Sequence, residues 1–162
     1  MSKGHSLALA GVFFDAMTQI VDADQVGQAA VWSATSEAAS NEVFNISNGD
    51  PTRWSQLWPE IAAYFGVQAG KPRPLPLASI MSEYSDLWRR LAQKHGLKYP
   101  DLAGLVNWKF LEFVFSIEFD IVLALGKIRR AGFAQHPETM SGFRNRFDEY
   151  ITQGILPKVP LR

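Results

Sequence analysis

The tyrosines are the first residues to test for acid–base chemistry. On a helix, a lysine four residues after a tyrosine lies beside the phenol and lowers its pKa, so that the tyrosine can donate a proton. The residues found four positions after Tyr64, Tyr84, Tyr99 and Tyr150 are Gln68, Trp88, Ala103 and Gly154. None of them is a lysine, so the sequence contains no catalytic pair of this kind.

Glycine loops that bind phosphate are also missing from the sequence. The twelve glycines form neither G-x-G-x-x-G nor G-x-x-G-x-x-G, patterns that let a backbone approach a dinucleotide closely. Gly126 precedes Lys127, but no glycine stands five positions before Gly126, so a P-loop is excluded as well. We therefore expect no cofactor-binding residues in this chain.

Metal ligands and nucleophiles are equally sparse. His5, His95 and His136 are far apart in the sequence, and none belongs to an H-E-x-x-H motif. The chain has no cysteine, which excludes disulfides, thiolate metal sites and cysteine nucleophiles. The serine motif G-x-S-x-G does not occur either. The sequence therefore predicts no metal site and no catalytic residue.

Three carboxylates leave one enzymatic alternative open. Glu112, Glu118 and Asp120 stand in a stretch rich in aromatic residues, where a perturbed carboxylate can act as an acid or a base. Glu118 and Asp120 are two positions apart, however, so on a helix they would point to different sides. This spacing favours a solvated pair over a catalytic one.

The overall composition narrows the class of protein. The 162 residues are enough for one domain with a proper core. Sixteen basic and sixteen acidic residues give no net charge, so nothing favours binding to nucleic acid. No uncharged run reaches the eighteen residues of a membrane helix. We expect a cytoplasmic protein with no membrane contact.

The stretch 42–66 carries the clearest structural pattern. Val43, Phe44 and Ile46 predict a short strand, and Asp50 with Pro51 is typical of a helix start. Large apolar residues then recur at helical spacing, at Trp54, Leu57, Trp58, Ile61 and Phe65. Gly66 should end this helix. Pro59 inside the pattern predicts a kink or two short helices.

Similar signals predict the other elements. Asp22 and Gln25 have capping-box spacing for a helix over about 23–35, after a possible strand at 19–21, with an apolar face of Val26, Ala29, Ala30 and Ala34. One further helix is expected from Ser79 to Gly96, and another begins at Asp101. The second should turn these side chains inward: Leu102, Leu105, Val106, Phe110 and Phe113. Two more helices are expected over 121–131, ending before Gly132, and over 137–153, ending before Gly154. The fold class is mainly α with a few short strands (α+β), after a flexible start at 1–11.

Several separated strings resemble one family. NEVFNISNGDPTRWSQLWPEIAAYFG, AMTQIVDADQVGQAAVWSATSEAASNE, LVNWKFLEFVFSIEFDIVLALGKIRRAGF and FDEYITQGILP are similar to the C-terminal half of extended short-chain dehydrogenases/reductases, in the progesterone 5β-reductase/iridoid synthase-like branch of the NAD-dependent epimerase/dehydratase superfamily. The resemblance covers about residues 12–157. It implies that 12–162 form the helical substrate-binding domain of such an enzyme, without a complete Rossmann sheet.

The resemblance also implies where a substrate would lie. In this family the segment matching 108–115 contributes bulky apolar side chains to the pocket, which points to Trp108, Phe110, Leu111 and Val114, and more weakly to Ile80 and Met81. Such a pocket suits an apolar carbonyl compound, such as an enone, a terpenoid aldehyde or a steroid-like ketone. The alternative is that these residues simply fill the core, because the two roles look alike in sequence.

Two functions follow from the missing motifs. The first is the substrate-binding C-terminal part of an NAD(P)-dependent reductase, present as a truncated or split chain that is not catalytically competent alone. NADP is then expected only with the Rossmann half, which in the family carries the glycine fingerprint and the catalytic Tyr and Lys. The alternative is an autonomous small-molecule-binding or dimerisation module. Because apolar surface would be uncovered, we expect a homodimer or a separate Rossmann-type partner.

Overall fold

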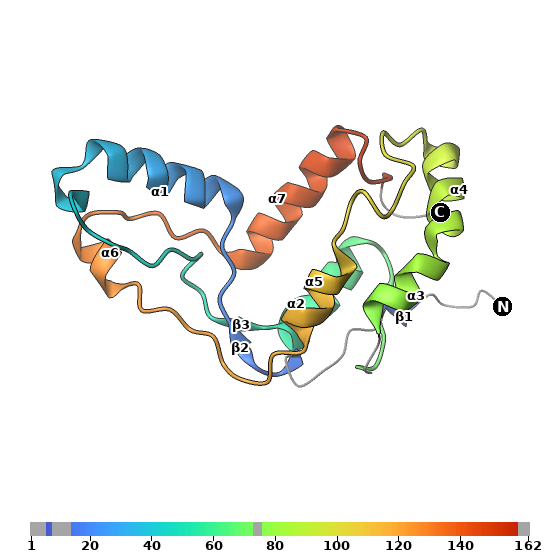
Figure 1. The fold of residues 1–162 in the computed structure, drawn as a ribbon, viewed down its shortest axis with the longest axis horizontal. Coiled ribbons are helices and arrows are strands. Elements are labelled where there is room, and N and C mark those ends of the chain that lie inside the picture. Colours follow the sequence, from blue (N-terminus) through green and yellow to red (C-terminus); the bar gives the residue numbers. More distant parts are fainter. Residues whose placement is uncertain (1–5, 8–13, 73–75, 159–162) are drawn as a thin grey trace.

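The computed structural model describes residues 6–7, 14–72 and 76–158. Figure 1 shows an elongated molecule with α1 and α6 at one end, α3 and α4 at the other, and α2, α5 and α7 between them. The helices are α1 (Ala23–Thr35), the 3-10 helix η2 (Glu37–Ala39), α2 (Trp54–Tyr64), α3 (Leu77–Glu83), α4 (Ser85–His95), α5 (Trp108–Phe115), α6 (Gly126–Arg130) and α7 (Thr139–Thr152). The expected flexible start at 1–11 lies outside the described residues, apart from Ser6 and Leu7.

Strands make up little of the described chain. β1 (Ser6–Leu7) pairs in parallel with β4 (Gln68–Ala69). β2 (Met17–Thr18) pairs antiparallel with β3 (Thr52–Arg53), so that Met17 lies opposite Arg53. The prediction of a helix-rich chain with a few short strands is confirmed.

The described core consists of two apolar clusters. The first cluster contains Ala29, Leu125, Ile128 and Phe133, with Trp32, Phe44 and Ile46 packed against it. The second cluster contains Leu57, Ile61 and Met140, with Ile20, Trp54, Trp58, Phe65, Phe143 and Phe147 packed against it. The predicted stripe of α2 is therefore confirmed, since all five of its residues belong to the second cluster or pack against it.

Helix α1 begins as predicted but packs differently. The Asp22 side chain accepts from the Asp24 backbone N–H at 2.8 Å, which confirms the N-cap. Gln25 does not complete a capping box, because its amide donates to the Ser47 and Gln135 carbonyls at 2.8 and 3.0 Å. The strand expected at 19–21 is wrong, since β2 ends at Thr18.

The predicted apolar face of α1 is largely wrong as well. Ala29 is buried, but the side chain of Val26 is 44% exposed, and Ala30 and Ala34 are exposed. The apolar contact of α1 instead comes from Ala29 and Trp32, which pack on the first cluster. Ala30 lies about 100° around the helix axis from Ala29 and therefore faces solvent.

The stretch 42–53 departs most from its pattern. No strand forms at Val43, Phe44 and Ile46 within the described chain. Asp50 does not cap α2, because Thr52 and Arg53 first pair with β2 and the helix begins at Trp54. The carboxylate of Asp50 instead accepts from the backbone N–H of Thr139, the first residue of α7, at 2.9 Å.

Helix α2 runs without a break through Pro59, so the two-helix alternative is wrong. Its end is as predicted. Gly66 has a φ of 70°, and its N–H donates to Ala63 while that of Val67 donates to Ala62, each at 3.0 Å. This is a Schellman motif, which requires a residue that tolerates the left-handed conformation.

The region 77–116 is more interrupted than predicted. Ser79 is not an N-cap, because α3 already begins at Leu77 and is separated from α4 by Tyr84. Gly96, with a φ of 62°, does end α4. The helix expected from Asp101 is wrong: Asp101 accepts from Ala103 in a turn.

Helix α5 therefore begins later, at Trp108. The side chain of Asn107 caps it by accepting from the Phe110 N–H at 3.0 Å. Leu102 is buried, and Leu105 and Val106 are half-buried. Phe110 and Phe113 do not point inward as predicted, since they are 60% and 64% exposed.

The helix expected over 121–131 is reduced to α6. The residues before it, 121–125, are not helical, and the Ile121 N–H donates to the Met17 carbonyl at 2.8 Å rather than to a helical partner. Gly132, with a φ of 102°, and buried Phe133 end α6 as predicted. The last helix is confirmed with its bounds at Thr139–Thr152, followed by Gly154 with a φ of 70°.

Candidate functional site

Helices α3 and α5 pack on each other and form the first part of the candidate site. Glu112 of α5 accepts from the Ala78 backbone N–H, in the first turn of α3, at 3.0 Å. A carboxylate at this place satisfies an unpaired N–H and complements the helix dipole. Glu112, one of the three acid–base candidates, therefore holds two helices together.

The other two carboxylates are not on a helix. Glu118 and Asp120 are exposed in the connection between α5 and α6. Asp120 accepts from the Met17 backbone N–H at 2.7 Å, and so ties this connection to β2. The two acids thus have the solvated character that their spacing favoured.

An open cavity of about 560 Å³ lies beside the start of α5. Trp108 is the predicted pocket residue that contributes to its wall. The lining residues are Ala78, Ser82, Ser85, Ala103, Gly104, Leu105, Val106, Asn107, Trp108 and Lys109. The wall thus combines short apolar side chains with polar groups, and Trp108 is its aromatic residue.

The other predicted pocket residues lie outside this cavity. Phe110, Leu111 and Val114 share one side of α5, within about 100° of one another on a helical wheel. Leu111 and Val114 are half-buried, whereas Phe110 is exposed. Ile80 and Met81 are half-buried on α3. Residues 110, 111 and 114 thus lie on neighbouring parts of α5, and Trp108 lies about 60° beyond Leu111 and about 160° from Phe110.

The side of α5 that lies opposite Phe110 and Phe113 is fixed to the second cluster. The ring centroids of Trp54 and Phe115 lie 5.3 Å apart in an edge-to-face arrangement. This contact, together with the bond from Glu112, holds α5 so that Phe110 and Phe113 stay turned to the surface.

A second group of side chains was missed by the sequence reasoning. We call it the polar seam: Asp22, Asn48, Asp50, Thr139 and Arg146. The Asp22 backbone N–H donates to Asn48 Oδ1 at 2.8 Å, and Asn48 Nδ2 donates to Thr139 Oγ1 at 3.2 Å. Thr139 Oγ1 in turn donates to Asp50 Oδ1 at 2.7 Å. These bonds join the start of α1, the loop before α2 and the start of α7.

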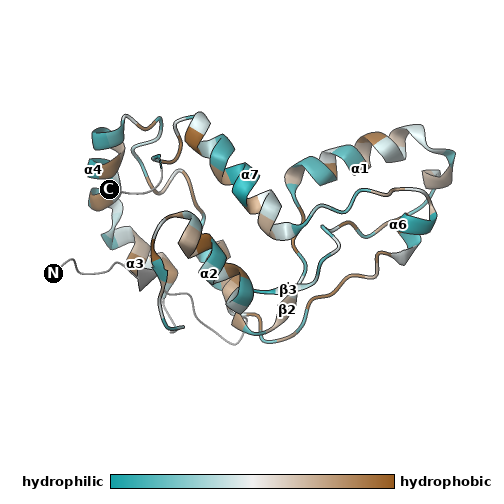
Figure 2. Ribbon diagram, turned by 180° about the vertical axis from the view of Figure 1, so that it is seen from behind, coloured by the Kyte–Doolittle hydropathy of each residue, from teal (hydrophilic) through white to brown (hydrophobic). Residues whose placement is uncertain are grey.

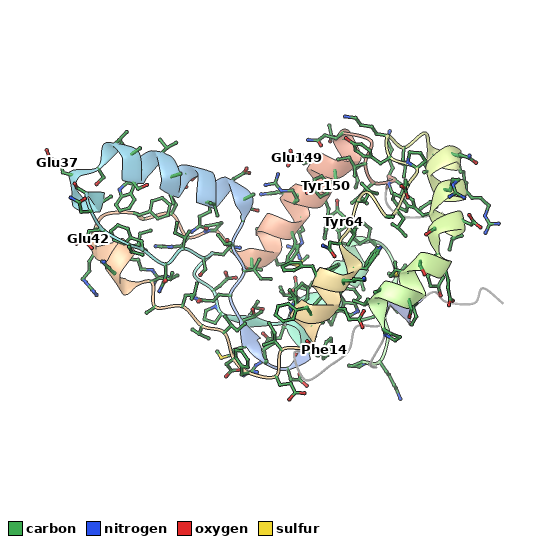
Figure 3. All side chains as sticks on the ribbon, viewed as in Figure 1. Phe14, Glu37, Glu42, Tyr64, Glu149 and Tyr150 are labelled. Carbon is green, nitrogen blue, oxygen red and sulfur yellow. The ribbon has the colours of Figure 1, made fainter. Side chains whose placement is uncertain are left out.

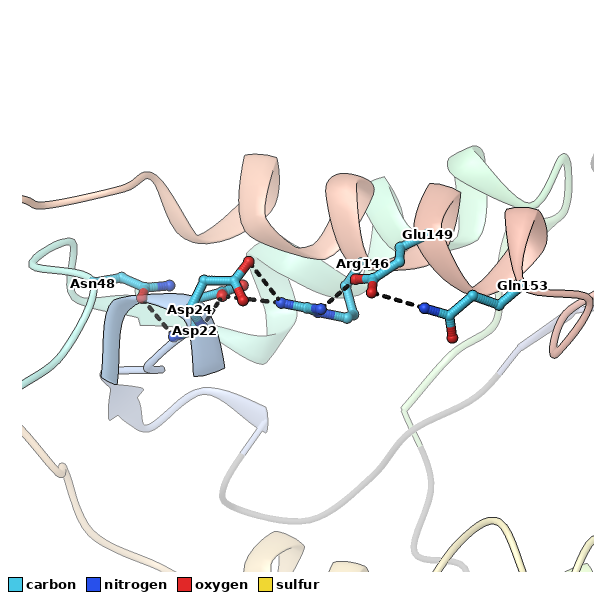
Figure 4. A network of polar contacts seen from close by, with 6 residues as sticks. All are labelled: Asp22, Asp24, Asn48, Arg146, Glu149 and Gln153. Atoms are coloured by element: carbon cyan, nitrogen blue, oxygen red, sulfur yellow. Dashed lines mark hydrogen bonds and ion pairs between the residues drawn. The ribbon is translucent and has the colours of Figure 1, made fainter. Parts of the chain in front are cut away.

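Arg146 completes the polar seam from the middle of α7, as Figure 4 shows. Its Nη2 lies 3.2 Å from Asp22 Oδ1 and 3.1 Å from Asp24 Oδ2, and Nη1 is paired with Glu149. Burial alone would lower the pKa of Arg146, but the three carboxylates outweigh it and raise that pKa. The guanidinium is therefore a fixed positive charge between two helices.

The polar seam lacks the parts of a catalytic site. Its acids are engaged with backbone N–H groups, Thr139 or Arg146, and the Thr139 hydroxyl beside Asp50 is buried away from any substrate. Little in the sequence indicates the polar seam, because its bonds join residues 26 to 124 positions apart. Within the described residues, no group of three His, Asp or Glu side chains could hold a metal ion.

Glu42 lies beside α6, as Figure 3 shows, and its Oε2 is 2.6 Å from Lys127 Nζ.

Across the part of the chain that the structure describes, no helix has the length and apolar character needed to cross a bilayer.

Comparison with known proteins identifies the family to which the chain is similar. A family model described as a PRISE-like Rossmann-fold domain matches residues 4–157. An (S)-8-oxocitronellyl enol synthase of Nepeta racemosa is 29% identical over 142 aligned residues, covering 86% of this chain and 34% of that protein. A short chain dehydrogenase of Penicillium aethiopicum is 26% identical over 164 residues, covering 90% of this chain and 43% of the relative.

A short chain dehydrogenase of Leptosphaeria maculans is 29% identical over 156 residues, covering 86% of this chain and 38% of that protein. The chain thus spans between about a third and two fifths of these relatives. The family is named for a Rossmann fold, while the described residues hold two short two-stranded ladders. The resemblance drawn from the sequence is confirmed, and the chain belongs to the PRISE-like Rossmann-fold domain family, among the short-chain dehydrogenases/reductases.

Proposed function

We propose that residues 12–162 are the helical substrate-binding part of an NAD(P)-dependent reductase of enone or carbonyl compounds, and that this chain does not reduce its substrate alone. The exposed face of α5 carries the proposal: Phe110 is 60% exposed beside half-buried Leu111 and Val114, on a chain of this family. The names of the relatives, an enol synthase and short chain dehydrogenases, support the type of chemistry.

The face of α5 would act by removing an apolar substrate from water. Burying a phenylalanine side chain fully is worth about 1.5 to 3 kcal/mol, and Phe110 still has most of its surface to lose. Ile80 and Met81 on α3 would extend this wall. Trp108, at the neighbouring cavity of about 560 Å³, would contact a bulkier substrate from the other side of the helix.

Hydride and proton transfer would come from elsewhere. The sequence has neither a glycine fingerprint nor a tyrosine followed by a lysine four residues later. NADP and the acid that protonates the product would therefore belong to a Rossmann-type half, which this chain would cover.

Binding of an apolar enone to the isolated chain tests the face of α5 directly. A steroid enone should quench the tryptophan fluorescence in a saturable way, and Phe110→Ala should weaken its affinity about tenfold, which corresponds to ~1.4 kcal/mol. Leu87→Ala is the matched control, because Leu87 is 51% exposed on α4, away from α5. Equal affinities for the two variants would contradict the assignment.

Activity assays test the second half of the proposal. Calorimetry with NADPH should show no binding heat, and the chain should not oxidise NADPH in the presence of an enone. Turnover by the pure 162-residue chain would contradict the proposal.

The exposed apolar side chains also favour a dimerisation module as a second candidate. Phe113, Phe119 and Val122 are 64%, 67% and 51% exposed, and such surface is usually covered by a partner. Sedimentation velocity over a range of concentrations should then show a homodimer that binds the enone with unchanged affinity. A monomer at all concentrations would contradict this candidate.

A further inference from the structure

A separate cavity of about 450 Å³ lies where the start of α1 meets α7. We call it the α1–α7 cavity, and its wall includes Asp22, Asp24, Gln25, Arg146 and Glu149. Figure 2 shows the hydrophilic colour of the middle of α7, which forms part of this wall. A cavity of this size is large enough for a small ligand, and its polar wall points to a polar one.

Gln25 lies in this wall with a buried acceptor that has no partner. It is 3% exposed, and its Nε2 donates to the Ser47 and Gln135 carbonyls at 2.8 and 3.0 Å. These two bonds fix the amide, because the reversed amide would set its oxygen against two carbonyl oxygens. Gln25 Oε1 makes no hydrogen bond within the described residues. Buried polar atoms are almost always paired, so a donor inside the cavity would complete this group.

Asp22 offers a second acceptor at the same end of α1. Its Oδ1 accepts from the Asp24 N–H and pairs with Arg146, whereas Oδ2 accepts no hydrogen bond from a described residue. Gly142 of α7 has no side chain to cover this oxygen, since a Cβ there would come within 3.3 Å of it. Asp22 and Gln25 are three residues apart and therefore lie on the same side of the helix. The start of α1 thus presents two acceptors to a ligand in the cavity.

Carboxylates outnumber cations in the wall of the cavity. Asp22, Asp24 and Glu149 contribute three negative charges, against the single positive charge of Arg146. His136 adds little charge near pH 7, because burial above all lowers its pKa from 6.5. The N-terminus of α1 contributes about half a positive charge, which leaves an excess of roughly one and a half negative charges. This excess favours a cation over an anion.

The same wall holds two amide side chains that are free to bind a ligand. Gln28 and Asn145 are exposed, and neither forms a hydrogen bond with another described residue. We infer that the α1–α7 cavity binds a small aliphatic amine, whose ammonium group donates to Gln25 Oε1 and Asp22 Oδ2. An ammonium group fits because it carries three donors, no acceptor and a positive charge. This inference is independent of the proposed function, since the cavity shares no residue with the face of α5 or with the cavity beside it.

Three ligands with the same four-carbon chain test the chemistry of the site. Putrescine ends in two ammonium groups, butanediol in two hydroxyls and succinate in two carboxylates. Calorimetric titration of the full chain at low ionic strength should show saturable binding of putrescine at one site. Butanediol should bind at least about tenfold more weakly, because charge-assisted hydrogen bonds are stronger than neutral ones. Succinate should give no binding heat.

A matched pair of variants locates the charge effect. Glu149→Gln removes one negative charge from the wall, whereas Glu60→Gln removes one outside it, where Glu60 is paired with Arg144. Glu149→Gln should weaken putrescine binding about threefold or more, and Glu60→Gln should leave it within about twofold. If Glu149→Gln fails to fold, Asp24→Asn removes a charge from the wall at a side chain that is 76% exposed.

Nuclear magnetic resonance shows whether the amine occupies this cavity. Putrescine should shift the side-chain amide signals of Gln25 and Asn145, and leave that of Gln93 on α4 unchanged. The inference is overturned if putrescine does not bind, if butanediol or succinate binds as tightly, or if the two glutamate variants lose equal affinity. Shifts spread evenly over the surface would also overturn it, because they would indicate unspecific attraction to carboxylates.

Discussion

Thr139 shows how a single residue can join distant segments of the chain, here the start of α7 and the loop that contains Asn48 and Asp50. It is 1% exposed, its backbone N–H and hydroxyl both donate to Asp50, and its hydroxyl also accepts from Asn48. Each of these polar groups thus has a hydrogen-bond partner in place of the water that it has lost. In such a network the loss of one member costs more than the bond itself, because its partners stay buried without replacement.

Thr139→Val should therefore be strongly destabilising although it keeps the shape of the side chain. We expect the free energy of unfolding to fall by about 1 to 3 kcal/mol, because Asp50 Oδ1 and Asn48 Nδ2 lose a shared partner. Urea denaturation followed by tryptophan fluorescence measures the loss. Thr139→Ser keeps the hydroxyl and should lose clearly less; equal losses for both variants would count against the network.

Tyr64 should make stability depend on pH in the alkaline range. Burial, the 2.6 Å hydrogen bond to Asp148 and the charge of Asp148 raise the pKa of Tyr64 from 10.0 to about 12. The unfolded chain then loses the phenolic proton first, so the stabilisation is complete below pH 10 and is lost as the pH rises toward 12. The free energy of unfolding should fall more steeply over this range in the wild type than in Tyr64→Phe.

Urea denaturation at several alkaline pH values, with tyrosinate absorbance recorded in parallel, measures this slope. Tyr150→Phe is the matched control, since Tyr150 is 38% exposed and the variant leaves the Tyr64–Asp148 bond in place. If Tyr64→Phe and Tyr150→Phe follow the same curve, Tyr64 is not the titrating group.

At the scale of elements, signals that act within a few residues predicted the structure well. Asp22 caps α1, and Gly66 and Gly132 end α2 and α6, because these motifs are completed by the next turn of chain. Asp50, followed by Pro51, was also predicted to begin a helix, and that prediction is wrong. Its carboxylate binds Thr139, 89 positions away, and nothing near Asp50 in the sequence indicates this partner.

The candidate site was also only partly predictable from the sequence. The apolar character of the face formed by Phe110, Leu111 and Val114 can be read from helical spacing. Which side of α5 turns outward could not, because it is decided by Glu112 binding α3 and by Phe115 packing on Trp54. Similarly, residues 43–46 have the composition of a strand, but a ladder also needs a partner strand.

A pair of glycines tests the role of helix ends. Gly132 has a φ of 102°, and an added Cβ would meet no atom within 4 Å, so Gly132→Ala should cost about 1 to 2 kcal/mol through the backbone alone. Gly27 also has free space around its Cβ position, but it lies inside α1, where alanine is preferred. Gly27→Ala should therefore stabilise by about 0.5 to 1 kcal/mol. Thermal unfolding that moves both variants in the same direction would contradict this account.

At the scale of the whole molecule, the described core is divided between two clusters, and large apolar side chains remain outside both. Phe119 and Val122 lie in the connection that runs between the second cluster and α6. Their exposure gives the molecule an apolar surface that is available for a partner. In both proposals a partner would cover this surface: a Rossmann-type half in the first, and a second copy of the chain in the second.

Replacing these two side chains should change association but not folding. The double variant Phe119→Ser and Val122→Ser should bind a hydrophobic dye such as anilinonaphthalene sulfonate less strongly and sediment as a smaller species. Its free energy of unfolding should stay within about 0.5 kcal/mol of the wild type, as is usual for surface positions. A large loss of stability would show that the connection is part of the core.

The salt bridge between Asp22 and Arg146 also bears on how the chain is synthesised. The two residues are 124 positions apart, and the first cluster likewise joins Ala29 to Phe133. During synthesis α1 is made 124 positions before Arg146, so its contacts with α7 and with Phe133 cannot yet exist when α1 leaves the ribosome. Until these later segments are made, Trp32 and its neighbours stay unpacked and are a natural target for chaperones.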